Sequence, residues 1–265
     1  MLDMPNRKEL RISSMRDKVS PAEWQARVDT AAAYRLVALH GMDDLGANHI
    51  STRIPGEGHN FLINPYGMMY DEITASSLIK IDEHGNILGK PDYGDFDFGI
   101  NRAGFVIHSA IHKAREDANC VIHTHTAPGM AISSLACGLL PLNQTAMRFA
   151  KVKYHDFNGV VLDLSEQERL VRDLGDASTM ILRNHGLLVT GNTVGEAFNW
   201  LHRMEKSCVA QLAAMACNTP LQPVPEDVVE KTWLNYQPGT RRPFGVMEWP
   251  AMLRMLDRKN PGYDV

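Results

Sequence analysis

The residues of this chain best suited to chemistry are two histidines separated by one residue, at the end of the segment Cys120–His125. The β-branched residues before them favour a strand, and side chains at positions i and i+2 of a strand project from the same face. His123 and His125 can therefore offer both imidazoles to one metal ion. A third histidine, His185, follows sixty residues later beside Gly186. Three neutral imidazoles with an open fourth position are a known arrangement for catalytic zinc.

These patterns also fit structural roles. A single histidine on a strand is more often a hydrogen-bonded core residue than a metal ligand, and His-x-His is a short pattern. His108 and His112 stand four residues apart, which on a helix also suits metal ligands. Packed or surface histidines are the commoner explanation of such a pair.

Composition restricts the class of protein. The chain has 265 residues, 44% of them hydrophobic, and a net charge of −4, so it can bury a large core and has no basic excess for nucleic acid or anionic membranes. No uncharged stretch is long enough to span a bilayer, and the N-terminus has no apolar signal segment. We therefore expect a cytoplasmic protein whose four cysteines are reduced, buried thiols.

Helical and strand-like patterns alternate along the chain. We expect a single domain over residues 1–265, with an N-terminal arm over about 1–20 and a proline-rich tail over about 219–265 that has one or two short helices. Ser20 and Thr193 open capping boxes, and Gly41 can end the first helix. The other expected elements are a polar loop or strand edge over 46–53, a strand at 61–63, a hairpin of 78–81 with 86–88, a helix over 102–115, a helix from Thr126 to near Gly138, and a long helix through Ala216.

Several blocks of the sequence resemble the class II aldolase and adducin family. The segment 46–51 is similar to its Gly-Asn-x-Ser motif, and 63–67 to its Ile-Thr-Pro-x-Gly turn. Segments 121–125 and 182–186 match its two metal-ligand blocks. The segments 101–112, 137–141 and 154–156 look most like the adducin-head branch and its bacterial relatives.

The resemblance implies a three-layer α/β/α fold with a mixed central sheet, usually in a cyclic homotetramer with active sites between subunits. It also implies a divalent metal on His123, His125 and His185, most often zinc, although iron, manganese or cobalt suit the same ligands. In the aldolase members the metal acts as a Lewis acid and stabilises the enediolate formed when a C–C bond breaks.

One departure from the family changes the expected chemistry. Its aldolases carry a Glu or Asp nineteen residues before the first metal histidine, after a pair of serines that helps to hold phosphate. That position is Gly104 here, preceded by Arg102 and Ala103. The usual acid/base carboxylate and the phosphate-binding pair are therefore absent from their expected places.

Three functions remain open. The first is a metal-dependent lyase that cleaves a C–C bond, by aldol cleavage or decarboxylation, in a small, non-phosphorylated acid or carbonyl compound. The second is a non-heme iron oxygenase on the same histidines. The third is a catalytically silent, adducin-like assembly module. The three intact histidines favour an active site over the assembly module.

Further site residues follow from the resemblance or from their chemistry. Arg102 can bind a substrate carboxylate, or simply be an exposed residue at a helix start. His108 can supply a proton or orient a ligand. Asn48, Asn64 and Gly67 are candidates for substrate binding, although turn formation also explains the asparagines. Tyr236 is the candidate for a tail residue that reaches the neighbouring subunit's site.

Overall fold

The computed structural model describes residues 10–159, 164–237, 240 and 245–265, so most of the expected N-terminal arm, at 1–9, lies outside the described part. One eight-stranded sheet in the order β4-β3-β2-β1-β5-β8-β7-β6 forms its centre. Strands β6 and β7 are parallel and all other neighbours are antiparallel, which confirms the expected mixed sheet. The strands are β1 His49–Arg53, β2 Phe61–Ile63, β3 Ile79–Ile81, β4 Ile87–Gly89, β5 Cys120–Thr124, β6 Lys153–His155, β7 Thr179–Leu182 and β8 Gly186–Gly191.

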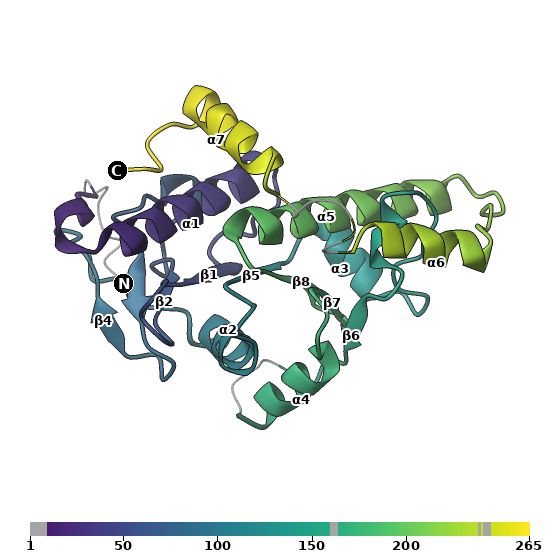
Figure 1. Cartoon of the computed structure of the whole chain (residues 1–265), viewed down its shortest axis with the longest axis horizontal. Helices are drawn as coiled ribbons and strands as arrows, with labels where there is room; N and C mark the ends of the chain where they lie inside the picture. The colour runs from purple at the N-terminus through teal and green to yellow at the C-terminus, as the bar shows by residue number, and fades with distance from the viewer. Residues whose placement is uncertain (1–9, 160–163, 238–239, 241–244) are drawn as a thin grey trace, which may run out of the picture.

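Helices cover both faces of this sheet. Figure 1 shows α1 and α5 along one face and α2 and α4 along the other, so the three-layer α/β/α arrangement is confirmed. The α-helices are α1 Pro21–Leu39, α2 Arg102–Ala114, α3 Ala127–Ser133, α4 Leu164–Leu174, α5 Val194–Ala216, α6 Glu226–Asn235 and α7 Glu248–Lys259. Short 3₁₀ helices lie at η1 Arg16–Lys18, η2 Tyr70–Glu72 and η3 Ala146–Phe149.

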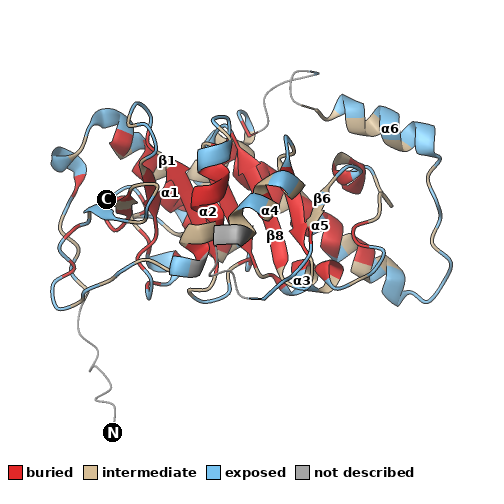
Figure 2. Cartoon of the chain, turned by 90° about the horizontal axis from the view of Figure 1, so that it is seen from below, coloured by how far each residue is buried: buried red, intermediate tan, exposed pale blue. Residues whose placement is uncertain are grey.

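The sheet separates two apolar cores. The larger one lies under α1 and α5, and the smaller one joins α2 and α4 to β5, β7 and β8 through side chains such as Ile111, Leu170 and Leu188. Every residue of β5, β7 and β8 is buried, and Figure 2 shows the central strands around β8 in red. Strands that are buried on both faces read as continuous apolar runs, which is why the chain around the histidines lacks polar alternation.

The expected helix boundaries are largely correct. Ser20 Oγ accepts a hydrogen bond from the Glu23 amide at 3.1 Å, and Thr193 Oγ1 accepts one from the Glu196 amide at 3.0 Å. Gly41 follows α1 in a left-handed conformation with φ of 64°. The helix that we expected to run to near Gly138 instead ends at Ser133. There the Ser133 carbonyl and hydroxyl accept hydrogen bonds from the amides of residues 184 and 185.

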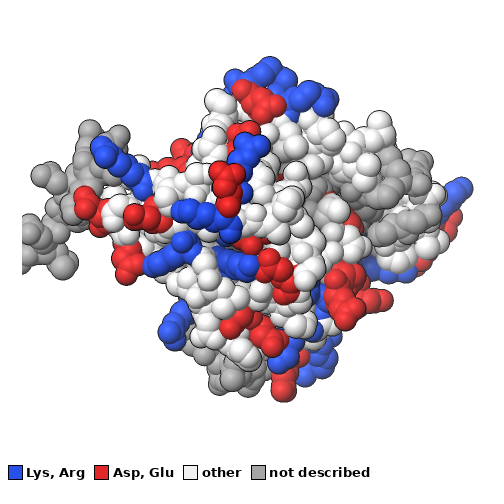
Figure 3. Space-filling view, turned by 60° about the vertical axis from the view of Figure 1, so that its left-hand side comes forward, with Lys and Arg blue, Asp and Glu red and all other residues white. Residues whose placement is uncertain are grey.

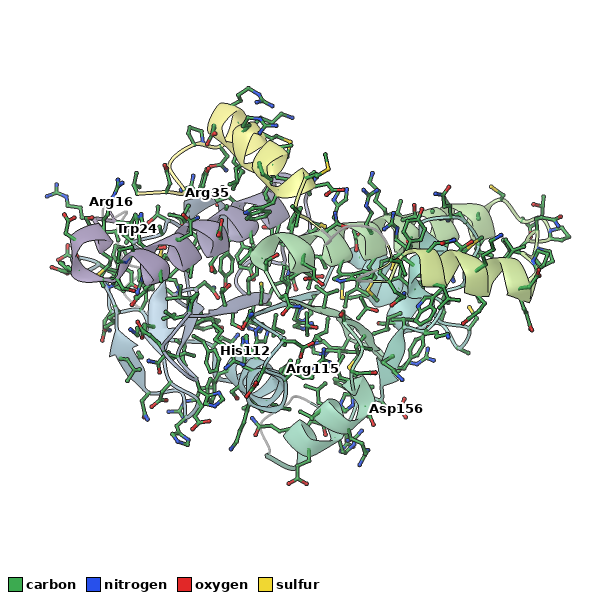
Figure 4. The ribbon with its side chains drawn as sticks, in the orientation of Figure 1. Arg16, Trp24, Arg35, His112, Arg115 and Asp156 are labelled. Atoms are coloured by element: carbon green, nitrogen blue, oxygen red, sulfur yellow. The ribbon has the colours of Figure 1, made fainter. Side chains whose placement is uncertain are left out.

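In the segment 46–53, expected to be a polar loop or strand edge, residues 46–48 lie outside the strands, but residues 49–53 form the interior strand β1, between β2 and β5. The polar side chains of Ser51 and Thr52 are tolerated there because both find hydrogen-bond partners in the helices. Thr52 Oγ1 accepts a hydrogen bond at 2.8 Å from Thr30 Oγ1 of α1. On the other face, Ser51 Oγ lies 2.7 Å from His108 Nδ1 and 2.6 Å from His112 Nε2. Figure 4 shows His112 on α2 below the sheet.

The proline-rich tail has two helices, as expected, and α7 folds back over α1. Trp249 Nε1 donates to Asp29 Oδ1 at 3.0 Å, and the Arg35 guanidinium donates to Asn260 Oδ1 at 2.5 Å and to the Pro261 carbonyl at 2.7 Å. Figure 4 places Arg35 between α1 and the C-terminal segment.

Two of the four cysteines are buried and two are exposed. Cys120 and Cys208 are buried free thiols, but Cys137 and Cys217 are exposed, so the expectation of four buried thiols is wrong for two of them. Lys and Arg alternate with Asp and Glu on the face shown in Figure 3. No helix among the described residues is long and apolar enough to cross a membrane.

Candidate active site

Three histidine side chains converge at one end of the central strands. The Nε2 atoms of His123 and His125 are 2.8 Å apart, and those of His125 and His185 are 2.9 Å apart. Ligand atoms of all three lie within 4.8 Å of one another. The convergence expected from the His-x-His pattern and the distant third histidine is confirmed. We call these three residues the histidine cluster.

Backbone pairing explains how residues sixty positions apart meet. Strand β5 pairs with β8, so that His123 stands opposite Leu188 and Thr124 opposite Leu187. His185 lies in the tight turn between β7 and β8, where Asn184 adopts a left-handed conformation with φ of 54°. Asparagine tolerates that conformation better than most residues. The turn is tied to α3 by the hydrogen bond from the His185 amide to Ser133 Oγ, at 3.1 Å.

The hydrogen bonds of the cluster leave ring nitrogens free to bind a cation. His123 Nδ1 donates to the Leu187 carbonyl at 2.8 Å, so its Nε2 carries a lone pair when the ring is neutral. His125 Nδ1 lies 3.3 Å from the Asp44 carboxylate, which favours the same tautomer. Two lone pairs then face each other at 2.8 Å, an arrangement that a cation stabilises.

Burial keeps the rings of His123 and His185 neutral. It holds the pKa of His123 well below its ordinary range, and the neighbouring His185 and His125 lower it further. Burial and the nearby His125 lower the pKa of His185 to about 4. Metals bind the neutral imidazole, so the donor set fits a divalent ion such as zinc.

The cluster opens into a cavity of about 650 Å³, a size typical of small-molecule sites. One acidic side chain, Asp44, lies on its wall, whereas no lysine or arginine is among the described residues that line it. The lining residues are Asp44, Leu45, Gly46, Ala47, His49, Tyr66, Gly67, Asn101, Gly104, Ile107, His123, His125 and His185.

Of the three substrate-binding candidates, Gly67 lies on the cavity wall. Asn48 supports the site from behind, because its Oδ1 accepts a hydrogen bond from the His125 amide at 3.1 Å and its Nδ2 donates to the Met42 carbonyl. Asn64 is buried, and its Oδ1 accepts a hydrogen bond from the Tyr34 hydroxyl at 2.9 Å. In this chain both asparagines therefore contact protein groups.

The candidates for catalysis lie outside the cavity wall. Arg102 is exposed at the start of α2. His108 is 2% exposed and contacts Ser51 of β1. Tyr236 follows α6, where its ring stacks under Arg148 at 3.6 Å and its hydroxyl lies 2.5 Å from Gln144 Nε2. Their roles stay predictions.

The space that a side chain at position 104 would occupy is filled by His49. A Cβ atom added to Gly104 would lie under 3.0 Å from three atoms of the His49 ring. His49 stands opposite His123 in the β1–β5 pairing, so both side chains project from the same face of the sheet. Sequence reasoning treated His49 as part of a motif and did not select it as a site residue. The absence of a side chain at position 104 was the sequence feature that could have indicated a neighbouring residue in that space.

A hydrogen-bonded chain of histidines lies behind His49. His112 Nδ1 donates to the Ala118 carbonyl at 2.8 Å, so its neutral ring accepts a hydrogen bond at Nε2 from the Ser51 hydroxyl. The Ser51 oxygen can then accept from His108 Nδ1. The Ala118 carbonyl thus fixes the tautomer of His112, and through Ser51 that of His108.

We expect the buried imidazole of His112 to make the protein less stable in acid. Burial, and then the charge of Arg53, lowers the pKa of His112 to about 3 from its ordinary 6.5. Below pH 6.5 the unfolded state therefore binds a proton that the folded state does not. The free energy of unfolding then decreases as the pH is lowered. Between pH 7 and pH 5 this linkage amounts to about 2 kcal/mol for one histidine.

Urea unfolding of the wild-type protein and of His112→Gln at both pH values measures this term. Glutamine can hydrogen-bond but does not titrate, so the variant should lose about 2 kcal/mol less than the wild type between pH 7 and pH 5. An equal loss in the two proteins would show that His112 does not carry the effect.

Comparison with known proteins identifies the family. The model of the "Class II Aldolase and Adducin N-terminal domain" matches residues 28–212, more than half of the chain. The chain belongs to this class II aldolase and adducin family. The match contains the whole histidine cluster, which lies within it from His123 to His185.

Solved structures and a curated relative agree with this assignment. The chain matches an aldolase II superfamily protein from Pseudomonas syringae with 46% identity and a TM-score of 0.88, over 96% of this chain and 100% of that one. It matches an L-fuculose 1-phosphate aldolase from Glaciozyma antarctica PI12 with 27% identity and a TM-score of 0.78, over 96% of each chain. Alpha-adducin from Rattus norvegicus is 40% identical over 249 residues, which are 89% of this chain and 33% of the adducin. The family thus includes both a named aldolase and adducins.

Proposed function

We propose that this chain is a metal-dependent lyase of the class II aldolase type, which cleaves a C–C bond in a small, non-phosphorylated hydroxy or oxo acid or carbonyl compound. The observation that carries the proposal is the convergence of three imidazoles on one wall of a cavity. His123, His125 and His185 would hold a divalent ion, zinc above all, although iron, manganese or cobalt suit the same donors.

The residues around the cluster suit this chemistry. When bound, the ion supplies Lewis acidity, which stabilises the negative charge that develops on oxygen as the C–C bond breaks. Leu187 and Asp44 hold the outer nitrogens of His123 and His125, and so orient the rings. Gly104 offers no carboxylate for proton transfer. Decarboxylation suits such a site, because loss of CO₂ needs charge stabilisation more than it needs a base.

The walls of the cavity favour a substrate without phosphate. A phosphate dianion is normally bound by arginine, lysine or a helix N-terminus. Helix α2 begins at the wall, beside Asn101 and Gly104, but no lysine or arginine is among the described lining residues, and Asp44 would repel a dianion. A hydroxyl, a carbonyl or a single carboxylate is the better match.

We predict that the zinc-loaded protein releases CO₂ or an aldehyde from at least one acid in a panel of small hydroxy and oxo acids, but turns over sugar phosphates weakly or not at all. Coupled assays for the two products, run beside His125→Ala as the inactive control, measure this. Rapid cleavage of a sugar phosphate would contradict the inference from Gly104. Oxygen consumption by the iron-loaded protein would instead identify an oxygenase.

Similarity to alpha-adducin supports a second candidate, a catalytically silent assembly module. This module would need the fold and its surfaces but not the histidine cluster. A fully metal-loaded protein that is inert across the whole panel, and that assembles equally well with His125→Ala, would favour the assembly function over the lyase.

We also propose that the chain forms a homo-oligomer, with a tetramer as the expected state. Helix α6 lies at one end of the molecule in Figure 2 and exposes Val228 and Leu234, with 42% and 49% of their surface accessible. We expect these two exposed apolar side chains to contact neighbouring subunits. Light scattering at micromolar concentration should give a mass of about four chains, and Val228→Lys with Leu234→Lys should lower it. A stable wild-type monomer would contradict the proposal.

A further inference from the structure

His49 lies on the cavity wall, and the described residues leave its hydrogen-bonding capacity unused. It is 4% exposed, and neither ring nitrogen has a hydrogen-bond partner among the described residues. A buried polar atom without a partner costs about 1–3 kcal/mol, so natural sites seldom keep one without a reason. The ring nevertheless lies on the cavity wall, beside His123 of the histidine cluster, with ring centroids 6.1 Å apart.

The histidines behind His49 leave it without a partner on that side. His108 uses Nδ1 toward Ser51, and its Nε2 is also buried and unpartnered among the described residues. The rings of His49 and His108 meet edge to face, with centroids 5.7 Å apart, rather than through a hydrogen bond. His49 therefore lines the cavity with a hydrogen-bonding capacity that no described residue uses.

We propose that His49 is a substrate-binding residue, whose imidazole hydrogen-bonds a hydroxyl group of a small polyhydroxy acid held beside the histidine cluster. This inference deepens the proposed lyase function and rests on it for the position of the substrate. His49 takes the space that Gly104 leaves open, so the two residues form one feature of the site.

The chemistry of a neutral imidazole selects a hydroxyl group. The ring of His49 is 4% exposed and has no acidic hydrogen-bond partner among the described residues, so burial favours its neutral form, with one N–H donor and one lone pair. A hydroxyl group also donates one hydrogen bond and accepts others, so the two match. A phosphate or a further carboxylate group of the substrate would be bound poorly, because His49 offers it only one hydrogen-bond donor and no positive charge.

Lactate and glycerate provide a matched pair of probes, because they differ by one hydroxyl group. Calorimetric titration of the zinc-loaded protein should show one enantiomer of glycerate binding more tightly than the corresponding lactate, by roughly two- to tenfold. His49→Phe keeps a ring of similar size but removes both nitrogens. We expect it to lose this preference while it keeps its zinc and its affinity for lactate. His84→Phe, at an exposed histidine far along the chain from the cluster, is the control that keeps the preference.

Two results would overturn the proposal. One is a wild-type protein that holds zinc and binds both acids equally. The other is a His49→Phe protein that still prefers glycerate. Neither result depends on turnover, so failure of the lyase assay with an intact, His49-dependent preference would refute the proposed reaction and leave the binding role of His49 in place.

Gly104→Ala tests the contact between Gly104 and His49 without changing His49 itself. The new methyl group overlaps the imidazole and must displace it, so the variant should also lose the preference for glycerate. In the wild-type background the substitution should lower the urea midpoint of unfolding. In a His49→Ala background it should have little effect, because the space filled by the imidazole is then free. Equal shifts in both backgrounds would show that the two residues are not coupled, and would overturn the proposal.

Discussion

Replacing His123 by alanine is expected to abolish tight metal binding, with a loss of affinity of at least roughly 100-fold. His123 is 1% exposed and contributes one of the three converging nitrogens, and its ring is fixed by the Leu187 carbonyl. Two remaining imidazoles give one chelate contact fewer and leave a second coordination position open. Elemental analysis after dialysis against a weak chelator should find about one ion per chain in the wild type and almost none in the variant.

Two further variants make this result specific. His185→Ala removes a less buried ligand from the turn between β7 and β8, so its effect on folding is smaller and its effect on metal should be similar. His84→Ala removes an exposed histidine and should leave the metal content unchanged. If folded His123→Ala and His185→Ala proteins keep one ion with wild-type resistance to the chelator, the histidine cluster is not the metal site.

Arg27→Met is expected to lower the free energy of unfolding by about 3–5 kcal/mol, because it leaves buried groups without their partner. Arg27 is fully buried in α1 and forms a 2.8 Å ion pair with Glu23. It also donates to the carbonyls of Ala75 and Leu78, at 3.2 and 2.8 Å. Desolvation lowers the pKa of Arg27, and the bond with Glu23 offsets part of that effect.

Urea denaturation measures this change, and Gln25→Met provides the matched control. Gln25 is exposed on the same helix and makes one 3.3 Å contact with Asp29, so its replacement should alter the free energy of unfolding by less than about 0.5 kcal/mol. If Arg27→Met is as stable as Gln25→Met, methionine packing compensates for the lost ion pair, and Lys80, 3.0 Å from Glu23, is sufficient to balance that carboxylate.

Local patterns in the sequence predicted much of the scaffold and three residues of the site. The alternation of side chains in a strand is a backbone property, so the common face of His123 and His125 could be inferred directly. Capping by Ser20 and Thr193 depends on contacts three residues apart, and both were predicted correctly. The position of His185 depended on resemblance to the family, because the β5–β8 pairing joins distant segments.

What could not be predicted arises from long-range packing. Nothing local shows that the segment containing His49 pairs with the one containing His123, or that α2 then brings Gly104 against the imidazole. Similarly, the early end of α3 depends on hydrogen bonds to the turn that carries His185. The exposure of Cys137 and Cys217 also depends on how their neighbours pack, which apolar surroundings in sequence do not reveal.

The origin of the histidine cluster has a consequence for assembly. All three rings come from a single chain: His123 and His125 lie on and just after strand β5, and His185 lies in the turn that precedes β8. Dissociating an oligomer by dilution would therefore remove no donor atom from the ion. A separated subunit should keep its metal even where it has lost any wall of the cavity that a neighbour supplies. Metal retention and catalytic activity are thus expected to respond differently to protein concentration.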